Sequence, residues 1–308
     1  MSPSRRSGFA RPISRLADRL RRRVARLRAR YDGVDHLFRA LDRYREVFGG
    51  RLAAAIAYYG FFATFALGLL AYSVLGFLLE YPAVEEAVAE YLAQNLPVIE
   101  TRQITAGRGA ASLVGLLGLL LAGVAWVDTL RSAQRLVWRL DQAPGNIVLR
   151  RGLDVLVLPV LGLLLIGSVA VAVGLQNWLG RLPTGQALAR PVGLLLTLGV
   201  NLLVAVALLA VLPRLRISPR RLLPPASLVA AGLLLLSTLG RLYISQVQHN
   251  PAYAVVATAA GLLIFLYLFH QLVLLGAAWA ATARSGRVVD LAFGSETAPG
   301  RPSPPAAA

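Results

Sequence analysis

Residues 52–79 read LAAAIAYYGFFATFALGLLAYSVLGFLL, a stretch of 28 residues that contains no acidic residue and no arginine or lysine. A helix rises about 1.5 Å per residue and needs roughly 20 apolar residues to cross the hydrocarbon layer of a membrane. The stretch lacks the ten-residue segments of alternating polarity that are typical of an outer-membrane barrel. Because lipid accepts only helices and closed barrels as spanning structures, we predict a transmembrane helix.

Five further apolar runs of this kind follow along the chain. The overall composition agrees with them, since 56% of the 308 residues are hydrophobic and only 15% are charged, which disfavours a soluble domain. We therefore predict an all-α membrane bundle of six transmembrane helices. The expected spans cover residues 52–79, 109–127, 155–175, 192–212, 222–240 and 252–283.

The orientation follows from the basic residues, all 32 of which are arginine, in a chain with a net charge of +17. The segments 1–51, 128–154, 213–221 and 284–308 together hold 27 arginines, whereas the alternate segments hold 5. Basic residues close to the spans are retained on the cytoplasmic side. We therefore expect a multi-pass protein of the bacterial cytoplasmic membrane with both termini in the cytoplasm.

The flanking segments differ in character from the spans. Residues 1–51 form an arginine-rich cytoplasmic segment in which we expect two amphipathic helices. The first is either a helix that lies on an anionic lipid surface or a solvated basic tail. The second ends near residue 48, where Gly49 and Gly50 allow a bend, and the tail 284–308 is expected to be disordered. The arginines expected at the lipid surface are Arg19, Arg22, Arg23 and Arg26.

Residues for catalysis do not converge anywhere in the sequence. The three histidines, His36, His249 and His270, fall in different topological regions, and the chain has no cysteine. Neither a phosphate-binding loop of Walker type nor a Gly-x-Ser-x-Gly elbow is present. We therefore expect no enzymatic activity, no metal and no cofactor. No RNA-binding motif interleaves aromatic residues with the arginines, so we expect membrane lipids rather than nucleic acid as partners.

Polar residues inside the spans carry the functional signal. Asn201 lies near the middle of the fourth run, and His270 and Gln271 lie in the expected cytoplasmic half of the sixth. An ionisable group inside a membrane is a functional hypothesis by default. The alternative is an interhelical hydrogen bond that serves packing alone. Together with Tyr58 and Tyr59, these three residues form the substrate path that we predict.

Two further patterns concern packing. Gly115, Gly118 and Ala122 are spaced for close helix approach, which is compatible with a monomer and with self-association. Asp128 and Asp154 lie at opposite ends of an arginine-rich segment, and we expect a stabilising cluster of ion pairs there. Their candidate partners are Arg131, Arg135, Arg150 and Arg151.

Three short motifs resemble a known family. They are AAAIAYYGFF at residues 53–62, the stretch from Trp126 to Trp138, and LVLLGA at residues 272–277. In their order and spacing they resemble the YihY/BrkB membrane family, whose older label, ribonuclease BN-like, is no longer credited. The resemblance covers roughly residues 47–283. The chain departs from the family pattern at Ala63 and Ala66, where serine and proline are usual, at Arg135, where asparagine is usual, and at Ala278, where glutamate is usual.

The resemblance implies an inner-membrane protein of six helices with cytoplasmic termini, in agreement with the arginine distribution. Some members of the family are linked to envelope processes such as lipid export, which by analogy implies a transporter of lipid or another envelope amphiphile. The alternative is an envelope scaffold that transports nothing and binds anionic lipid or a partner protein through its basic cytoplasmic segment. A mechanism that depends on the family's glutamate would not apply to this chain, because Ala278 replaces it.

Overall fold

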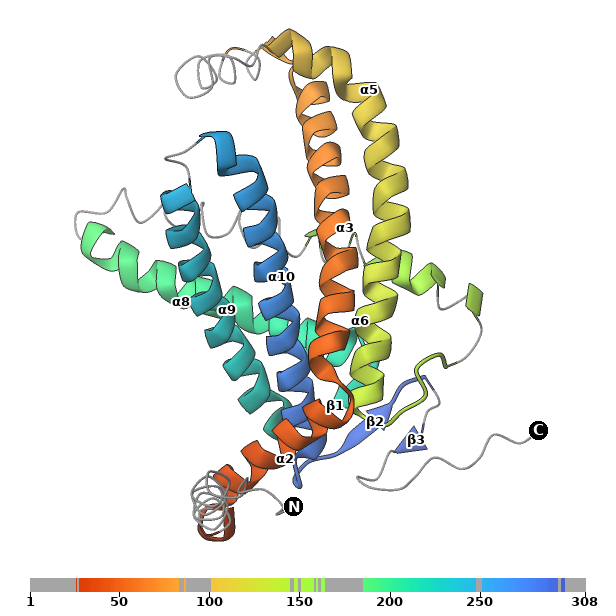
Figure 1. The fold of residues 1–308 in the computed structure, drawn as a ribbon, viewed down its shortest axis with the longest axis vertical. Coiled ribbons are helices and arrows are strands. Elements are labelled where there is room, and N and C mark those ends of the chain that lie inside the picture. The colour runs from red at the N-terminus through yellow and green to blue at the C-terminus, as the bar shows by residue number, and fades with distance from the viewer. Residues whose placement is uncertain are drawn as a thin grey trace, which may run out of the picture.

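The computed structural model describes residues 28–82, 101–144, 151–157, 185–247 and 251–292, together with a few isolated positions. The described chain is mostly helical (Figure 1). Helix α5 continues through the π-helical turn η1 into α6, and α8 continues into the π-helical turn η2. The elements are α2 (Asp32–Glu46), α3 (Gly49–Leu78), α5 (Thr101–Gly118), η1 (Leu119–Gly123), α6 (Val124–Val137), α8 (Gly185–Val206), η2 (Ala207–Val211), β1 (Leu215–Ile217), α9 (Pro219–Val247), α10 (Pro251–Thr282), β2 (Val288–Asp290) and β3 (Ser295–Glu296).

Within the described part of the chain, five helical stretches are long and apolar enough to cross a membrane. They coincide with five of the six predicted spans, while most of the third predicted span, residues 155–175, lies outside the described residues. The hydrophobic runs of the sequence therefore locate the helices correctly, because length and polarity alone decide which segments lipid accepts. The five stretches are Gly49–Leu78, Arg108–Val137, Pro191–Val211, Pro219–Tyr243 and Val256–Thr282.

A small antiparallel sheet corrects two expectations. Its strand order is β1-β2-β3, with Leu215 opposite Asp290 and Ile217 opposite Val288. The described fold is therefore not purely helical. The prediction of disorder from residue 284 onward is wrong for β2 and β3. The side chains of Leu215, Ile217 and Val288 are buried, so the tail adds apolar surface to the core, which offsets the entropic cost of ordering it.

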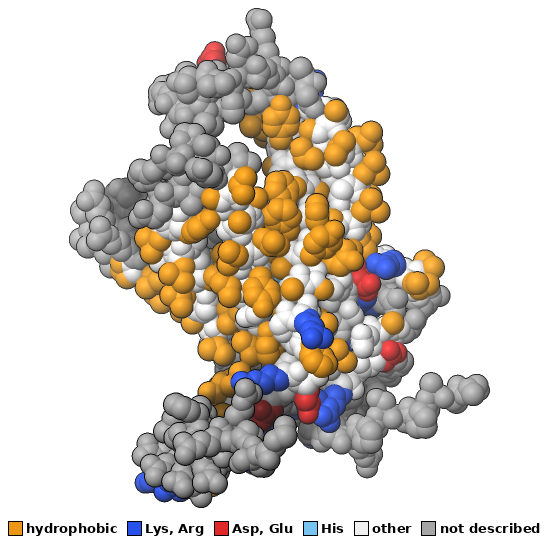
Figure 2. All heavy atoms as spheres, in the orientation of Figure 1, with side chains coloured by type: hydrophobic (Ala, Val, Ile, Leu, Met, Phe, Trp, Pro, Cys, Tyr) orange, Lys and Arg blue, Asp and Glu red, His pale blue; other side chains and the backbone are white. Residues whose placement is uncertain are grey.

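The hydrophobic core lies at one end of the helical bundle. It is built from the starts of α3 and α9, the ends of α6, η2 and α10, and the sheet, all near the bottom of Figure 1. We call this the arginine-rich end. Ile56, Leu130 and Leu274 are fully buried there. Figure 2 shows that apolar side chains cover the middle and upper part of the molecule and that charged side chains gather toward this lower end.

Helices α3 and α5 pack closely at the small residues Gly115 and Gly118. A side-chain carbon at Gly115 would lie 3.1 Å from the carbonyl oxygen of Ala66 and 3.0 Å from the backbone nitrogen of Leu70. A carbon at Gly118 would lie 3.1 Å from the Cβ of Ala66. The prediction of a close helix approach is therefore confirmed at Gly115 and Gly118, where the two backbones meet.

Helix α2 precedes the first span and is separated from it by a bend. Acidic residues in its first turn and basic residues in its last turn complement the helix dipole. The left-handed residue at the bend is Phe48, with a φ of 52°, rather than one of the two glycines. Gly49 serves a different purpose, because any side chain there would clash with the ring of Tyr44. The sequence thus predicted the bend but not the residue that makes it.

Helix α2 also packs against the end of α10. The Nε2 atom of His36 lies 2.9 Å from the carbonyl oxygen of Trp279, and the two rings lie 5.0 Å apart. Asp35 forms an ion pair of 3.8 Å with Arg284 just beyond α10. Burial raises the pKa of Tyr44 to about 12, which agrees with a phenol held in an apolar contact. Helix α2 is therefore docked on the bundle at the arginine-rich end.

We expect the docking of α2 to weaken as the pH falls. Burial lowers the pKa of His36 below its usual value, although its hydrogen bond to Trp279 acts in the opposite direction. The unfolded chain therefore binds more protons than the folded one as the pH falls through about 6.5, and the folded state loses stability there. Hydrogen exchange of the α2 amides, corrected for intrinsic rates, should show less protection at about pH 5.5 than at about pH 7.5. The His36→Asn variant should lose this difference, and equal protection of the wild type at both pH values would contradict the prediction.

Candidate functional site

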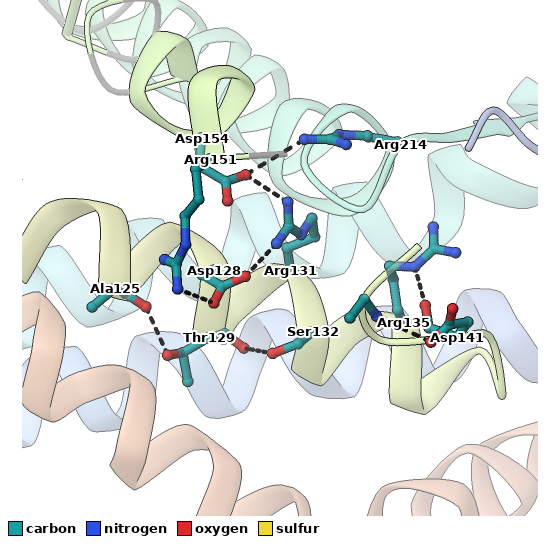
Figure 3. Close-up of polar contacts among 11 residues, drawn as sticks. Ala125, Asp128, Thr129, Arg131, Ser132, Arg135, Asp141, Arg151, Asp154 and Arg214 are labelled. Atoms are coloured by element: carbon teal, nitrogen blue, oxygen red, sulfur yellow. Dashed lines mark hydrogen bonds and ion pairs between the residues drawn. The ribbon is translucent and has the colours of Figure 1, made fainter. Parts of the chain in front are cut away.

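A cluster of alternating charges lies beside the middle of α6 (Figure 3). Arg131 donates a hydrogen bond of 2.6 Å from Nη1 to Oδ1 of Asp154 and a second one from Nη2 to Asp128. Arg214 reaches the same Oδ1 atom of Asp154 at 3.5 Å, and Arg151 reaches Oδ2 of Asp128 at 3.4 Å. We call these five residues the Arg131 cluster.

The Arg131 cluster confirms the ion pairs expected for Asp128 and Asp154. The side chains of Arg131 and Asp154 are each only 1% exposed. Asp128 and Arg131 are three residues apart on one helix face, which is a spacing that favours contact. Taking charges out of water costs several kcal/mol per ion unless partners compensate them, so Arg131 and Asp154, the two buried members, depend on their partners.

A second buried ion pair links α6 to the tail. Nη1 and Nη2 of Arg135 donate to Oδ1 and Oδ2 of Asp290 at 3.1 and 2.7 Å. Arg135 also donates to the carbonyl oxygens of Asp141 at 2.5 Å and Pro213 at 3.1 Å. Both side chains are 2% exposed or less. The sequence offered Arg135 only as a candidate partner for nearby aspartates, whereas its actual partner lies 155 residues further along the chain.

Arg221, in the first turns of α9, closes the C-terminal end of α10. It donates to the carbonyl oxygens of Ala280 at 2.7 Å, Ala281 at 2.8 Å and Gly286 at 3.3 Å. Its guanidinium lies 5.1 Å from the ring centroid of Trp138. The last carbonyls of a helix have no partner within the helix and carry partial negative charge, so a buried cation is well placed here. In the sequence alone, Arg221 is one of the arginines of the connecting segment 213–221, with no sign of this role.

His270 is held between two partners. Nε1 of Trp126, on α6, donates to Nε2 of His270 at 2.9 Å. Nδ1 of His270 lies 2.6 Å from the carbonyl oxygen of Leu266 and therefore carries the ring proton. This assigns the neutral tautomer with both nitrogens satisfied. Gly60 of α3 completes the contact, because a side-chain carbon there would lie 3.1 Å from the indole of Trp126.

We expect Gly60→Val to destabilise this junction of α3, α6 and α10. Valine would force its methyl groups against Trp126 and His270, and such overpacking costs about 1–3 kcal/mol. The matched control is Gly68→Val on the same helix, where no atom lies within 4 Å of the new side-chain carbon. Thermal unfolding in detergent should show a lower midpoint for Gly60→Val only. Equal midpoints for the two variants would mean that the junction adapts freely.

The other residues of the predicted substrate path do not share a common partner with His270. Asn201 donates across the helix interface, at 3.4 Å, to a backbone carbonyl of α9. Gln271 is half-buried. Tyr58 and Tyr59 are exposed, and their rings lie 5.5 Å apart in an edge-to-face arrangement. Asn201 and His270 thus bond to different helices, and the two tyrosines lie on the outer face of α3.

Most of the arginines predicted at the lipid surface cannot be compared with the structure. Arg19, Arg22, Arg23 and His249 lie outside the described residues, and Arg26 is exposed. Within the part of the chain that the structure describes, no three histidine, aspartate or glutamate side chains gather closely enough to hold a metal ion.

The chain is similar to a known family of membrane proteins. The model of the family described as Virulence factor BrkB matches residues 40–300. The Inner membrane protein YhjD of Escherichia coli K12 is 25% identical over 275 residues, covering 81% of this chain and 81% of that protein. An uncharacterised protein of Dickeya dadantii is 30% identical over 278 residues, covering 81% of this chain and 83% of that protein. No solved structure gives a significant match.

The matched range extends from α2 to beyond β3 and so includes all five apolar helices together with both buried ion-pair sites. The resemblance inferred from the three sequence motifs is confirmed. A relative described as an inner membrane protein agrees with a multi-pass protein of the bacterial inner membrane. The chain therefore belongs to the BrkB family of membrane proteins.

Proposed function

We propose that the chain is a transporter that moves a lipid or another envelope amphiphile across the bacterial inner membrane, with six crossings and both termini in the cytoplasm. The observation that carries this proposal is the uneven packing of the bundle. The arginine-rich end is closed by a buried core and by ion pairs. Toward the other end, α9 and α10 present apolar flanks. The proposal assigns no catalytic chemistry to the chain.

The unevenness is clearest on α9 and α10. No residue between 234 and 243 of α9 or between 256 and 269 of α10 is buried, whereas both helices carry several buried residues nearer the arginine-rich end. Leu235 is 62% exposed and Ile264 is 58% exposed. Apolar flanks of this kind can accommodate an acyl chain. Helices α9 and α10 are thus packed at the arginine-rich end and exposed on their flanks toward the other end, whereas α3 and α5 stay in close contact there.

A specific observation favours a second candidate, the scaffold that transports nothing. The polar groups of His270 and Asn201 are engaged in hydrogen bonds between helices. Such bonds are worth about 0.6 kcal/mol each and require no substrate. In this function the apolar flanks contact bulk lipid alone, and the arginine-rich segment before α2 binds anionic lipid or a partner protein.

The two candidates differ in a reconstituted system. The purified chain is placed in liposomes with fluorescent lipid in both leaflets, and an external quencher measures how fast inner-leaflet lipid becomes accessible. Transport predicts faster access than in protein-free liposomes. It also predicts that Ile264→Trp on the α10 flank slows access, whereas Leu121→Trp does not; Leu121 is 76% exposed and lies on η1. Access no faster than in protein-free liposomes would favour the scaffold, and deletion of residues 14–30 should then abolish its binding to anionic vesicles.

A further inference from the structure

Among the residues that the structure describes, the two fully buried aspartates are held in different ways. Asp290 is satisfied on both oxygens, because Arg135 donates to each of them and the backbone N–H of Ala292 donates to Oδ1 at 3.0 Å. Asp154 receives both of its arginines, Arg131 and Arg214, on Oδ1 alone. Its second oxygen, Oδ2, is buried and has no hydrogen-bond partner among the described residues. The arginines therefore compensate the charge of Asp154 at Oδ1, and Oδ2 lacks a hydrogen-bond donor in the described part of the chain.

This asymmetry matters for protonation. An ionised carboxylate offers about four acceptor positions on its two oxygens, and a buried oxygen without a donor carries a desolvation cost. A proton bound to Oδ2 would remove the larger cost of burying an ionised carboxylate, while Oδ1 could still accept hydrogen bonds. Burial raises the pKa of Asp154 above its usual value, and the neighbouring charge of Asp128 acts in the same direction. The charges of Arg131, Arg214 and Arg151 oppose the shift.

Asp154 also lies where three parts of the chain meet. It belongs to the helical segment 151–157, which leads toward the third apolar run. Arg131 lies near the end of the second span, and Arg214 lies in the connection between η2 and β1 (Figure 3). The charge on Asp154 thus helps to hold these three parts together. Asp128 and Arg214 are 29% and 22% exposed, so solvent reaches the edge of the cluster.

We propose that Asp154 is a proton-binding site, at which a proton from water at the arginine-rich end binds Oδ2 and weakens the attachment of segment 151–157 to Arg131 and Arg214. An O–H bond forms, the aspartate becomes neutral, and no oxidation or reduction takes place. The extension that this proton drives amphiphile movement rests on the function proposed above. Proton binding itself does not depend on that function.

Infrared difference spectroscopy on the full chain in lipid nanodiscs tests the site directly, with ¹³C-labelled aspartate to identify the carboxyl band. As the pH is lowered from about 8 to about 5.5, where ordinary aspartates stay ionised, a protonated-carboxyl band should appear in the wild type and be missing in Asp154→Asn. The band should move to lower pH in Asp128→Asn, because a charge that raises the pKa is removed. In Arg214→Gln it should move to higher pH for the opposite reason.

These opposite shifts keep the test decisive even where Asp154→Asn fails to fold. A wild type without the band, a band that persists in a folded Asp154→Asn variant, or shifts in the wrong directions would overturn the assignment. The coupling is tested separately, in liposomes that carry a pH gradient across the membrane. Lipid access should respond to the gradient in the wild type but not in Asp154→Asn. Gradient-independent access in the wild type would overturn the coupling, whereas absence of any lipid movement would reject transport and leave the infrared result to decide the proton site.

Discussion

Replacing Arg135 by methionine is expected to lower the free energy of unfolding by about 3–5 kcal/mol. Arg135 and Asp290 satisfy each other through two parallel hydrogen bonds in a site that solvent does not reach. Methionine fills much of the same volume but leaves the carboxylate of Asp290 buried without its cation. Two backbone carbonyls, those of Asp141 and Pro213, lose a donor as well. The penalty therefore arises mainly from the groups that remain, not from the attraction that is lost.

The double variant Arg135→Met with Asp290→Leu provides the matched control. When both charges are replaced by apolar side chains, most of the stability should return, because removal of a buried ion pair is often neutral or stabilising. Unfolding of the purified protein in detergent, followed by circular dichroism, measures all three proteins. A single variant within about 0.5 kcal/mol of the wild type would show that water compensates Asp290.

The second large effect is expected for Arg221→Met, which should lower the free energy of unfolding by about 3 kcal/mol. A buried acceptor that loses its hydrogen bond costs about 1–3 kcal/mol, and this variant strips the donors from Ala280 and Ala281. The stacking of the guanidinium on Trp138 is lost with them. Because these carbonyls end α10, we expect that helix to fray at its last turn, next to the segment that leads into β2.

The neighbouring residue supplies the control for this prediction. Arg220 is exposed, and Arg220→Met should change stability by less than about 0.5 kcal/mol. Limited proteolysis reports the fraying, since cleavage after Arg284 or Arg287 should be faster in Arg221→Met than in the wild type. Equal cleavage rates in Arg220→Met and Arg221→Met would argue against a capping role for Arg221.

The sequence predicts those parts of the fold that depend on local composition. A run such as residues 52–79 is identified by its lack of charge, because lipid imposes the same requirement on every spanning helix. The Asp128–Arg131 contact is also local, since the two residues lie one turn apart. By contrast, β1 and β2 are strands of three residues each, too short to carry a recognisable alternation of polarity. Their pairing depends on where the surrounding helices end.

The candidate site was predicted in part, for the same reason. Asp154 could be selected as an ion-pair residue from its place beside arginines, but its unequal oxygens depend on Arg214, which is far away in sequence. Asp290 belongs to a tail whose composition indicated disorder. An indole near the end of a span is typical of an interface anchor, so nothing local shows that Trp126 bonds to His270. Each of these interactions joins segments that are far apart in the sequence, so local patterns do not reveal it.

The bidentate pair between Arg135 and Asp290 also has a consequence for the order of biosynthesis. The ribosome makes Arg135 early, and 155 residues separate it from its counter-ion. Until β2 has been synthesised, the nascent bundle contains a cation that is costly to bury, so closure of its core is less favourable. Because chains emerge from the N-terminus onward, the helices are made and inserted first, and the Arg135–Asp290 pair in the core forms last. A chain truncated before residue 290 should therefore insert its spans but have a less stable core than the full chain.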